Sequence, residues 1–209
     1  MIALYFGNIG SGKSTIVSYF CKKYKKMRFM DGKGLIKPHF RHVVTNLEVD
    51  IKNVNYDDFK LLGDKYTYPP LTLVLVDEAS IVFNNRNTLN MSQSKIDYFK
   101  KSRHDMHDVY LFSQSWDDVD ITLRRLCKEL WHIRKIGPFT VARKVEKIVD
   151  VPSNDSPDES KDIKDGYRLV PFWHIFLFEK IYKIWFRPKY YKYFDSFAND
   201  DSRKVKRLS

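Results

Sequence analysis

The segment YFGNIGSGKSTI, residues 5–16, decides how this chain is expected to fold. It follows the pattern GxxxxGK[ST] from Gly7 to Ser14. The apolar run MIALYF (1–6) before it predicts a buried strand. The residues after it repeat apolar side chains at the spacing of a helix face: Ile16, Val17, Phe20, Tyr24 and Met27. A glycine-rich loop between a strand and a helix is the setting in which this pattern binds phosphate.

The residue types in the loop suit a nucleoside triphosphate. Glycine tolerates positive φ, so Gly7, Gly10 and Gly12 let backbone N–H groups turn toward phosphate oxygens. Lys13 is expected to neutralise the β- and γ-phosphates, and Ser14 to bind Mg²⁺. The predicted cofactors are ATP and Mg²⁺, and the predicted nucleotide-binding residues are Gly7, Asn8, Gly10, Ser11, Gly12, Lys13, Ser14 and Thr15. The alternative is a glycine turn that binds no ligand.

The segment LTLVLVDEAS, residues 71–80, supplies the acidic groups that such a loop requires. Residues 71–76 form a continuous apolar run, as expected of a parallel strand covered on both faces. Asp77 and Glu78 follow at its carboxyl end, where open α/β sheets place their ligand sites. Asp77 is predicted to bind Mg²⁺ with Ser14, and Glu78 to polarise the attacking water. The pair favours a hydrolase over a kinase; the alternative is two solvated carboxylates.

A third strand is predicted in DVYLFSQS, residues 108–115, and the polar Gln114 ends its apolar run. At the tip of a core strand, this amide could contact the γ-phosphate or orient water, although a lone Gln at a strand end is more often only solvated. The predicted catalytic residues are Lys13, Glu78 and Gln114. The predicted fold class is α/β: a P-loop NTPase with a mostly parallel central sheet flanked by helices, and with late strands near the C-terminus.

The composition predicts a globular protein with an anionic partner. The chain is 43% hydrophobic, carries a formal net charge of +11 and has a sequence pI near 9.5. Basic residues at 22, 23, 25, 26, 28, 33, 37 and 41 face a single acid in that region, and RKVKR occupies 203–207. Nucleic acid and an acidic membrane surface both suit this charge. The alternatives are a solvated helix end and a solubilising tail. Cys21 and Cys127 lie far apart, which favours a reduced, cytoplasmic setting.

The predicted organisation is one ATPase core with a C-terminal extension. Residues 1–149 form the core, 150–166 an exposed acidic loop or linker, and 167–209 late strands that complete the domain and end in a basic tail. The loop is predicted from its acidic, proline-containing composition. The apolar stretch at 169–186 is interrupted by four polar or charged residues, so no membrane span is expected: His174, Glu179, Lys180 and Lys183.

Five segments together resemble the zonula occludens toxin family: GNIGSGKST, VVTNLEV (43–49), LVLVDEAS, FKKSRHDMHDVYLFSQ (99–114) and DDVDITLRRL (117–126). YYKYFDSF (190–197) resembles the segment that closes the family's cytoplasmic domain. The resemblance implies a RecA-like ATPase of the FtsK/HerA type, as in the assembly ATPases of filamentous phages. It also implies a sensor role for Gln114, and a function for Arg103 and His104 in binding DNA, nucleotide or a neighbouring subunit.

These features together predict a viral ATPase that translocates DNA during virion assembly. The filamentous-phage members continue into a membrane span and an outer domain that this chain is expected to lack, so packaging suits it at least as well as extrusion. The predicted partners are viral DNA of undetermined strandedness, other copies in a homo-oligomeric ring such as a hexamer, and a capsid or membrane protein. The predicted location is the host cytoplasm, at the membrane surface or at the assembling virion.

Two alternatives stay open at this point. Arg86, Arg124 and Arg125 are each candidates for an arginine that enters a neighbouring subunit's site, and none is preferred. The alternative function is a nucleotide-dependent switch or assembly scaffold that binds a membrane or capsid partner without moving DNA.

Overall fold

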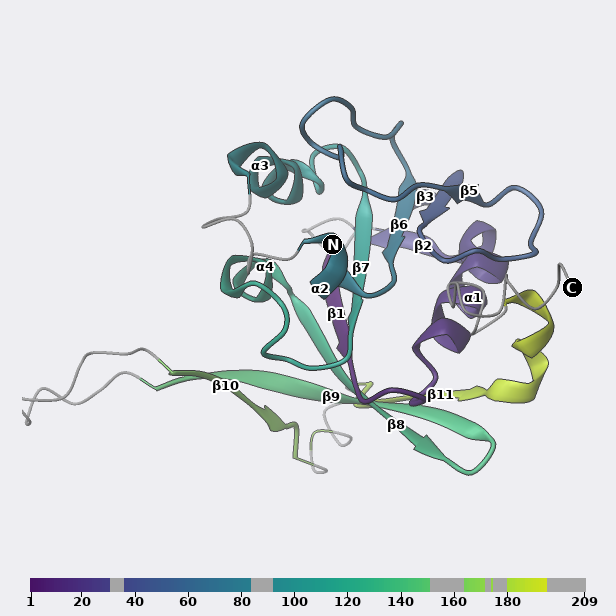
Figure 1. Cartoon of the computed structure of the whole chain (residues 1–209), viewed down its shortest axis with the longest axis vertical. Coiled ribbons are helices and arrows are strands. Elements are labelled where there is room, and N and C mark those ends of the chain that lie inside the picture. The colour runs from purple at the N-terminus through teal and green to yellow at the C-terminus, as the bar shows by residue number, and fades with distance from the viewer. Residues whose placement is uncertain (31–35, 84–91, 151–163, 172–173, 175–179, 195–209) are drawn as a thin grey trace, which may run out of the picture.

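The computed structural model describes residues 1–30, 36–83, 92–150, 164–171, 174 and 180–194, and it shows a mixed sheet with helices on both faces (Figure 1). The sheet follows the order β10-β9-β8-β1-β7-β6-β4-β5, and β11 pairs with β9. Its strands are β1 Ile2–Phe6, β4 His42–Thr45, β5 Asn55–Tyr56, β6 Thr72–Val76, β7 Asp108–Ser113, β8 Glu129–Ile136, β9 Phe139–Asp150, β10 Lys164–Leu169 and β11 Tyr182–Phe186. The helices are α1 Lys13–Lys23, α2 Ala79–Val82, α3 Gln93–Lys101 and α4 Ile121–Leu126, and a separate hairpin pairs β2 Arg28–Met30 with β3 Ile36–His39.

The parallel part of the sheet contains the three strands predicted from apolar runs. β1 lies between β7 and β8 and runs parallel to both. β6 pairs with β7, β4 with β6, and β5 with β4, all in the same direction. Every residue of β1, β6 and β7 is buried. Burial on both faces is the reason that these strands read as continuous apolar runs, and the predicted fold class is confirmed.

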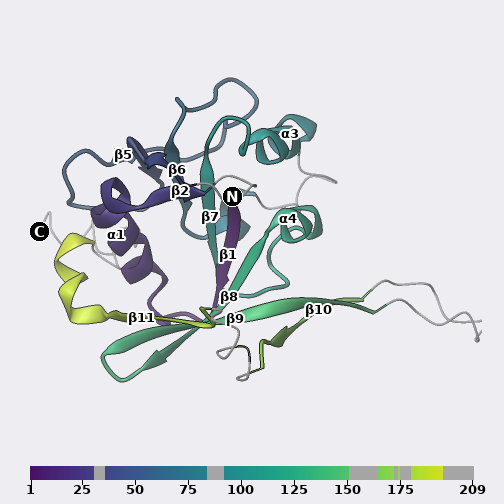
Figure 2. The same cartoon turned by 180° about the vertical axis from the view of Figure 1, so that it is seen from behind.

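Successive residues of the strands face two separate cores. Ile2, Leu4 and Phe6 of β1 belong to the core that includes buried residues of α3 and α4. Ala3 and Tyr5 belong to the core that includes α1. α1 therefore lies on one face of the sheet, and α3 and α4 lie on the other, as Figure 2 shows. The predicted apolar face of α1 is present, and it buries Ile16, Val17 and Phe20.

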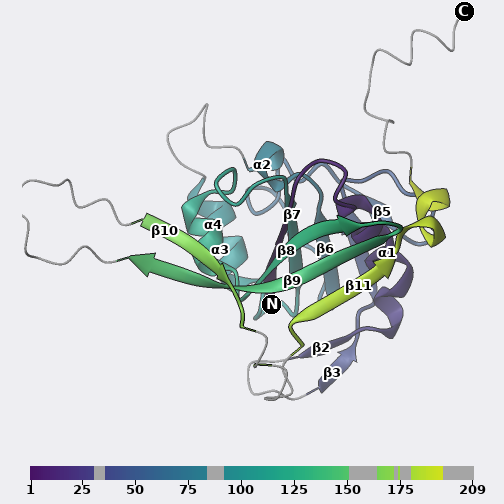
Figure 3. The same cartoon turned by 90° about the horizontal axis from the view of Figure 1, so that it is seen from below.

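The late strands extend the sheet in the antiparallel sense. β8 and β9 are joined by a turn of two residues, Gly137 and Pro138, in which Gly137 has a φ of 53°. β11 pairs with the first part of β9 and β10 with the second part (Figure 3). The predicted late strands are thus part of the same sheet as the core. The ends of the predicted loop 150–166 belong to β9 and β10, and residues 151–163 lie outside the described residues.

The described part of the chain contains no helix with the length and hydropathy needed to cross a membrane. Of the apolar stretch at 169–186, Leu169 ends β10 and the last five residues form β11. Residues 172–173 and 175–179 lie outside the described residues.

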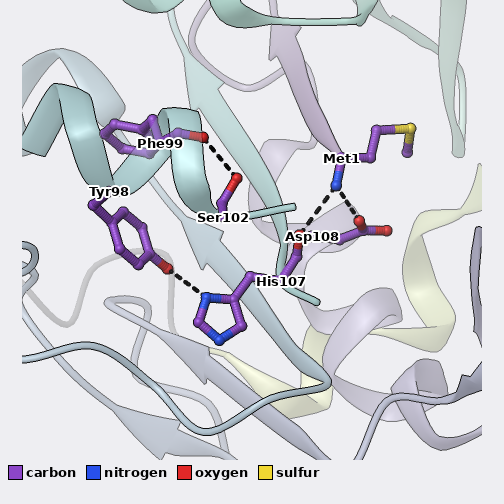
Figure 4. Close-up of polar contacts among 6 residues, drawn as sticks. All are labelled: Met1, Tyr98, Phe99, Ser102, His107 and Asp108. Atoms are coloured by element: carbon purple, nitrogen blue, oxygen red, sulfur yellow. Dashed lines mark hydrogen bonds and ion pairs between the residues drawn. The ribbon is translucent and has the colours of Figure 1, made fainter. Parts of the chain in front are cut away.

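A buried histidine fastens the amino end of β7 (Figure 4). His107 Nε2 lies 3.1 Å from the carbonyl oxygens of both Tyr68 and Pro69, and Nδ1 lies 3.3 Å from Tyr98 Oη. Because carbonyls only accept, Nε2 carries the proton and Nδ1 accepts from the tyrosine hydroxyl. Burial lowers the pKa of His107, so the ring is neutral. Beside it, the Met1 ammonium donates to the His107 carbonyl over 3.0 Å and pairs with Asp108.

His107→Gln is expected to lower the free energy of unfolding at pH 7.5 by about 1–3 kcal/mol, because it leaves buried partners of the imidazole unsatisfied. A pKa lowered by folding means that the stabilisation is present above the unfolded pKa of about 6.5 and is lost as the pH falls below it. The difference between wild type and variant should therefore shrink between pH 7.5 and 5.5 in urea unfolding. A difference independent of pH would contradict a neutral, buried His107.

Candidate active site

The loop between β1 and α1 adopts a conformation that requires glycine. Gly10 and Gly12 have φ of 75° and 101°, a region that side chains with a Cβ rarely adopt. A Cβ on Gly12, the N-cap of α1, would lie 1.9 Å from Thr140 Oγ1. A Cβ on Gly7 would lie 2.3 Å from the carbonyl oxygen of Ile133. β8 and β9 therefore leave the loop no room for a side chain at these two points.

The same loop is hydrogen-bonded to strands on both sides of it. The Thr140 hydroxyl of β9 donates to the Ser11 carbonyl over 3.1 Å. The Gly7 N–H donates to the carbonyl of Ser113, at the carboxyl end of β7, over 3.1 Å. The loop backbone is thus held in place by the sheet, which is the condition for preorganised binding of an anion.

Lys13, the first residue of α1, folds back over the loop. Its Nζ donates to the Gly7 carbonyl over 2.8 Å and to the Asn8 carbonyl over 3.4 Å. Burial lowers the pKa of Lys13, while the nearby carboxylates of Glu78 and Asp77 oppose this shift. An ammonium held in the loop in this way can neutralise the charge of a bound phosphate.

Asp77 and Glu78, which follow β6, carry oxygens that the described residues leave unsatisfied. Asp77 Oδ1 and Glu78 Oε1 are both buried and accept no hydrogen bond in the described part of the chain. Burial and the neighbouring Glu78 carboxylate raise the pKa of Asp77 to about 6, against the opposing effects of Lys13, the Glu78 N–H and the Ser14 side chain. Because such oxygens are costly to bury unpaired, the site suits a cation or a hydrogen-bond donor.

Asn46, just after β4, holds the acidic segment by its backbone. Its Nδ2 donates to the Asp77 carbonyl over 2.7 Å, and its Oδ1 accepts from the Asp77 N–H over 2.6 Å. Glu78 follows with φ 54° and ψ 58°, a left-handed conformation that is uncommon for this residue type. The two bonds fix the start of this turn, which directs Glu78 into the site. In the sequence, Asn46 stands within the segment VVTNLEV, and no role is predicted for it there.

These residues meet at one cavity of about 580 Å³, at the carboxyl edge of the parallel strands. The predicted site residues that line it are Gly10, Gly12, Lys13, Ser14, Thr15, Asp77, Glu78 and Gln114. Gly7, Asn8 and Ser11 belong to the same loop and shape its backbone. The structure thus brings together the residues for which catalytic and metal-binding roles are predicted.

The cavity is completed by side chains that the sequence analysis did not assign to a site. Leu47 follows Asn46, and Arg187, Tyr191 and Phe194 come from the segment after β11. This segment contains two short 3-10 helices, η3 (Arg187–Lys189) and η4 (Tyr191–Tyr193). The resemblance of YYKYFDSF to the family's closing segment was the only signal in the sequence, and it did not connect these residues to the loop.

Arg103 and His104 lie away from this cavity. Both are exposed and precede β7, whereas the cavity lies at the carboxyl ends of β1, β6 and β7. A strand of this length separates its two ends by about 20 Å. Contact with the nucleotide of the same chain is therefore ruled out, which leaves DNA or a neighbouring subunit as the predicted partner.

The three arginine candidates also differ in their surroundings. Arg124 lies 3.5 Å from Asp117, and its guanidinium lies 5.0 Å from the ring centroid of Trp116. Arg125, the next residue of α4, is exposed. Arg86 lies outside the described residues. Arg124 is therefore engaged within its own chain.

Asn46→Ala is expected to lower the free energy of unfolding by about 1–3 kcal/mol, because the Asp77 N–H and carbonyl lose their partners. Urea unfolding measures the change. Asn55→Ala, at an exposed position of the edge strand β5, is the matched control and should change stability by less than about 0.5 kcal/mol. Equal losses in the two variants would contradict a clamp at Asn46.

Asp77→Asn is expected to raise the midpoint of thermal unfolding of the ligand-free protein at pH 7.5 by about 5 °C. A carboxyl with a raised folded-state pKa favours folding below its unfolded pKa of about 4 and loses that contribution as the pH rises through about 6. The gain of the variant should therefore fall to about a third at pH 4.5, as measured by calorimetry. The same gain at both pH values would contradict a raised pKa.

Comparison with known proteins identifies the fold and the family. The N-terminal domain of zonular occludens toxin from Neisseria meningitidis is 17% identical, with a TM-score of 0.50 over 82% of this chain and 95% of that one. The genome packaging NTPase B204 from Sulfolobus turreted icosahedral virus 2 is 18% identical, with a TM-score of 0.44 over 66% of this chain and 75% of that one. The flagellar accessory protein FlaH from Methanocaldococcus jannaschii is 9% identical, with a TM-score of 0.46 over 68% and 76% of the two chains. Similarity at such low sequence identity shows the fold alone. The TM-scores of 0.44 and 0.46 support no further conclusion.

At the level of sequence, no curated protein matches the chain. The model of the zonular occludens toxin (Zot) family matches residues 1–199. This match includes the glycine loop, the acidic pair and the strand that ends at Gln114, so the resemblance inferred from these segments is confirmed. The chain is a member of the zonular occludens toxin (Zot) family.

Proposed function

We propose that this chain is an ATPase that translocates viral DNA during virion assembly. The observation that carries the proposal is the cavity in which Lys13, Ser14, Asp77, Glu78 and Gln114 meet beside a preorganised glycine loop. This set combines a phosphate cradle with groups that can bind a metal and activate water. Membership of the Zot family supports virion assembly as the process in which the ATPase acts, because the resemblance to that family implies an ATPase of phage assembly.

In the proposed reaction, the triphosphate lies along the loop between β1 and α1. Loop N–H groups and the start of α1 contact its oxygens, and Lys13 neutralises charge on the β- and γ-phosphates. Glu78 accepts a hydrogen bond from a water and polarises it, while Gln114 orients that water or contacts the γ-phosphate. The water oxygen bonds to the γ-phosphorus as one of its protons passes to Glu78, the bond to the β–γ bridging oxygen breaks, and ADP and phosphate leave while Glu78 returns the proton to phosphate or solvent.

The oxygens of Ser14 and Asp77 fit Mg²⁺, which prefers hard oxygen ligands. Asp77 Oδ1 is buried and has no hydrogen-bond partner among the described residues. A hydrogen bond from the Ser14 side chain to the same carboxyl lowers its pKa, which places the two side chains together. When bound, the ion would supply positive charge to the phosphate oxygens. Because the pKa of Asp77 is raised, this carboxyl must lose its proton before it can act as a ligand.

Positive charge supports DNA as the substrate that is moved. At the amino edge of the sheet, exposed basic residues lie at the end of α1 with the following 3-10 helix η1 (Tyr24–Lys26) and, on the other face, at the end of α3: Lys25, Lys26, Lys100, Lys101 and Arg103. This edge lies opposite the cavity. Contacts from Lys and Arg to phosphates give the sequence-independent binding that a translocating protein needs. Residues 31–35 and 203–207, from the two predicted basic regions, lie outside the described residues.

A homo-oligomeric ring, such as a hexamer, is part of the proposal, together with a capsid or membrane protein that anchors it. In such a ring an arginine of one subunit stabilises charge on the γ-phosphate bound by the next. Neither described candidate is preferred, because Arg124 lies 3.5 Å from Asp117 and Arg125, although exposed, also has a partner within its own chain.

Steady-state ATP hydrolysis without DNA, with single-stranded DNA and with duplex tests this function. Stimulation by one form of DNA supports a motor and identifies its track, and Lys13→Ala provides the background rate. A rate that ignores DNA would favour the alternative, a nucleotide-dependent switch that moves no DNA. No hydrolysis above the background in any condition would contradict an ATPase.

Glu78→Gln is expected to keep ATP binding within about threefold of wild type and to lower the hydrolysis rate by about 100-fold or more, because the amide cannot act as a base. Equilibrium binding and phosphate release measure the two effects separately. Glu48→Gln, at an exposed position after β4, is the matched control and should hydrolyse ATP normally. Normal turnover by Glu78→Gln would refute the assignment of Glu78.

A further inference from the structure

Residues 187–194, here called the strap, form one wall of the cavity and pass beside α1 (Figure 1, yellow-green). At one end, the Arg187 N–H donates to the Pro138 carbonyl in the turn between β8 and β9 over 2.9 Å. At the other end, the Asp50 N–H donates to the Tyr193 carbonyl over 2.9 Å. Phe194 also forms an isolated bridge with Val49, after β4. The strap therefore connects two parts of the sheet that flank α1.

The middle of the strap is packed on α1 itself. Tyr190 is 5% exposed, and its ring centroid lies 5.9 Å from that of Tyr19. Lys22 Nζ donates to the Tyr193 hydroxyl. With Tyr190 and Tyr193 engaged in this way, Tyr191 lies between two anchored residues. Tyr191 as a whole residue is 49% exposed, and it lines the cavity.

The cavity is lined by polar and apolar groups together. Its polar lining includes the glycine loop with Lys13 and Ser14, and its apolar side chains are Leu47, Tyr191 and Phe194, besides Ile9 of the loop. The rings of Tyr191 and Phe194 lie 6.4 Å apart, edge to face. A nucleotide likewise combines a polar and an apolar part, a phosphate chain and a flat base. Bases stack on aromatic side chains.

Arg187 adds a charge at the same wall. Its guanidinium lies 5.7 Å from the ring centroid of Tyr191. Its Nε is buried and donates no hydrogen bond to any described residue, although it belongs to a side chain that lines the cavity. A buried guanidinium N–H without an acceptor is costly, and a phosphate oxygen is the acceptor that this group fits best.

We propose that the strap is the base-binding half of the nucleotide site, in which Tyr191 and Phe194 pack against the nucleoside base and Arg187 donates to a phosphate oxygen. The inference rests on the proposed function, because it assumes that the loop binds the phosphates. It assigns to a segment more than 170 residues away in sequence the recognition of the part of the nucleotide that the loop does not hold.

Two ligands separate the base from the phosphates: ATP, and inorganic tripolyphosphate, which has no base. Calorimetric titration with each, in the presence of Mg²⁺, tests Tyr191→Ala against Tyr191→Phe. Tyr191→Ala should weaken ATP binding about tenfold and leave tripolyphosphate binding unchanged, whereas Tyr191→Phe keeps the ring and should bind both like wild type. Tyr56→Ala, at an exposed tyrosine of β5, is the matched control and should also bind both normally.

Arg187→Gln should weaken the binding of both ligands about tenfold, because the lost contact is to a phosphate. Its control is Arg134→Gln, at an exposed position of β8, which should bind both normally. Unchanged ATP binding by Tyr191→Ala, or an equal loss for both ligands, would overturn the role of the ring. Unchanged binding of both ligands by Arg187→Gln would overturn the role of the arginine.

The wild-type titrations distinguish failure of this inference from failure of the proposed function. Wild type that binds neither ligand, or binds ATP equally well after Lys13→Ala, would overturn both. Wild type that binds ATP through Lys13, with Tyr191→Ala indistinguishable from it, would overturn the strap alone. The midpoint of thermal unfolding of each variant, expected at the wild-type value, shows that a loss of binding is not a loss of folding.

Discussion

The glycine loop after β1 lies so close to β8 and β9 that one added carbon at Gly7 or Gly12 would collide with them. The rest of the site depends on this contact. It places the start of α1, and with it Lys13 and Ser14, at the edge where β6 and β7 end. The antiparallel strands β8 to β11 are therefore more than an extension of the sheet, because their first hairpin supports the loop. Gly10 is different: a Cβ there would meet nothing, and only its φ of 75° favours glycine.

The positions of Asp77 and Glu78 cost conformational and electrostatic free energy, and hydrogen bonds from a neighbouring residue offset part of it. The left-handed conformation of Glu78 costs about 1–2 kcal/mol for a residue with a Cβ. Two hydrogen bonds from Asn46 hold the preceding residue, and each contributes about 1 kcal/mol. Burying oxygens of Asp77 and Glu78 that have no hydrogen-bond partner among the described residues adds a further electrostatic cost. A cation and a polarised water would relieve this cost, so the groups that carry it are those that the proposed reaction uses.

The two edges of the parallel sheet carry different functional groups. Its carboxyl edge holds the cavity, and its amino edge carries the exposed lysines at the ends of α1 with η1 and of α3. If ATP hydrolysis at one edge drives DNA held at the other, the coupling must cross the sheet. α1 is the element best placed to carry it, because it begins with Lys13 in the loop and is followed directly by Lys25 and Lys26. The strap packs on this same helix through Tyr190.

By itself, the sequence determined the loop, the three central strands, the acidic pair and Gln114. Each of these follows from residues within about ten positions of one another, where apolar runs, glycine and strand-end polar groups have direct local meaning. Only the tertiary structure decided which distant residues complete the site: Asn46 against Asp77, Thr140 against the loop, and Arg187 and Tyr191 at the cavity. The physical reason is that these contacts depend on strand order and on the path of the chain across α1. No local periodicity records that order, because an apolar run looks the same whichever strand it pairs with.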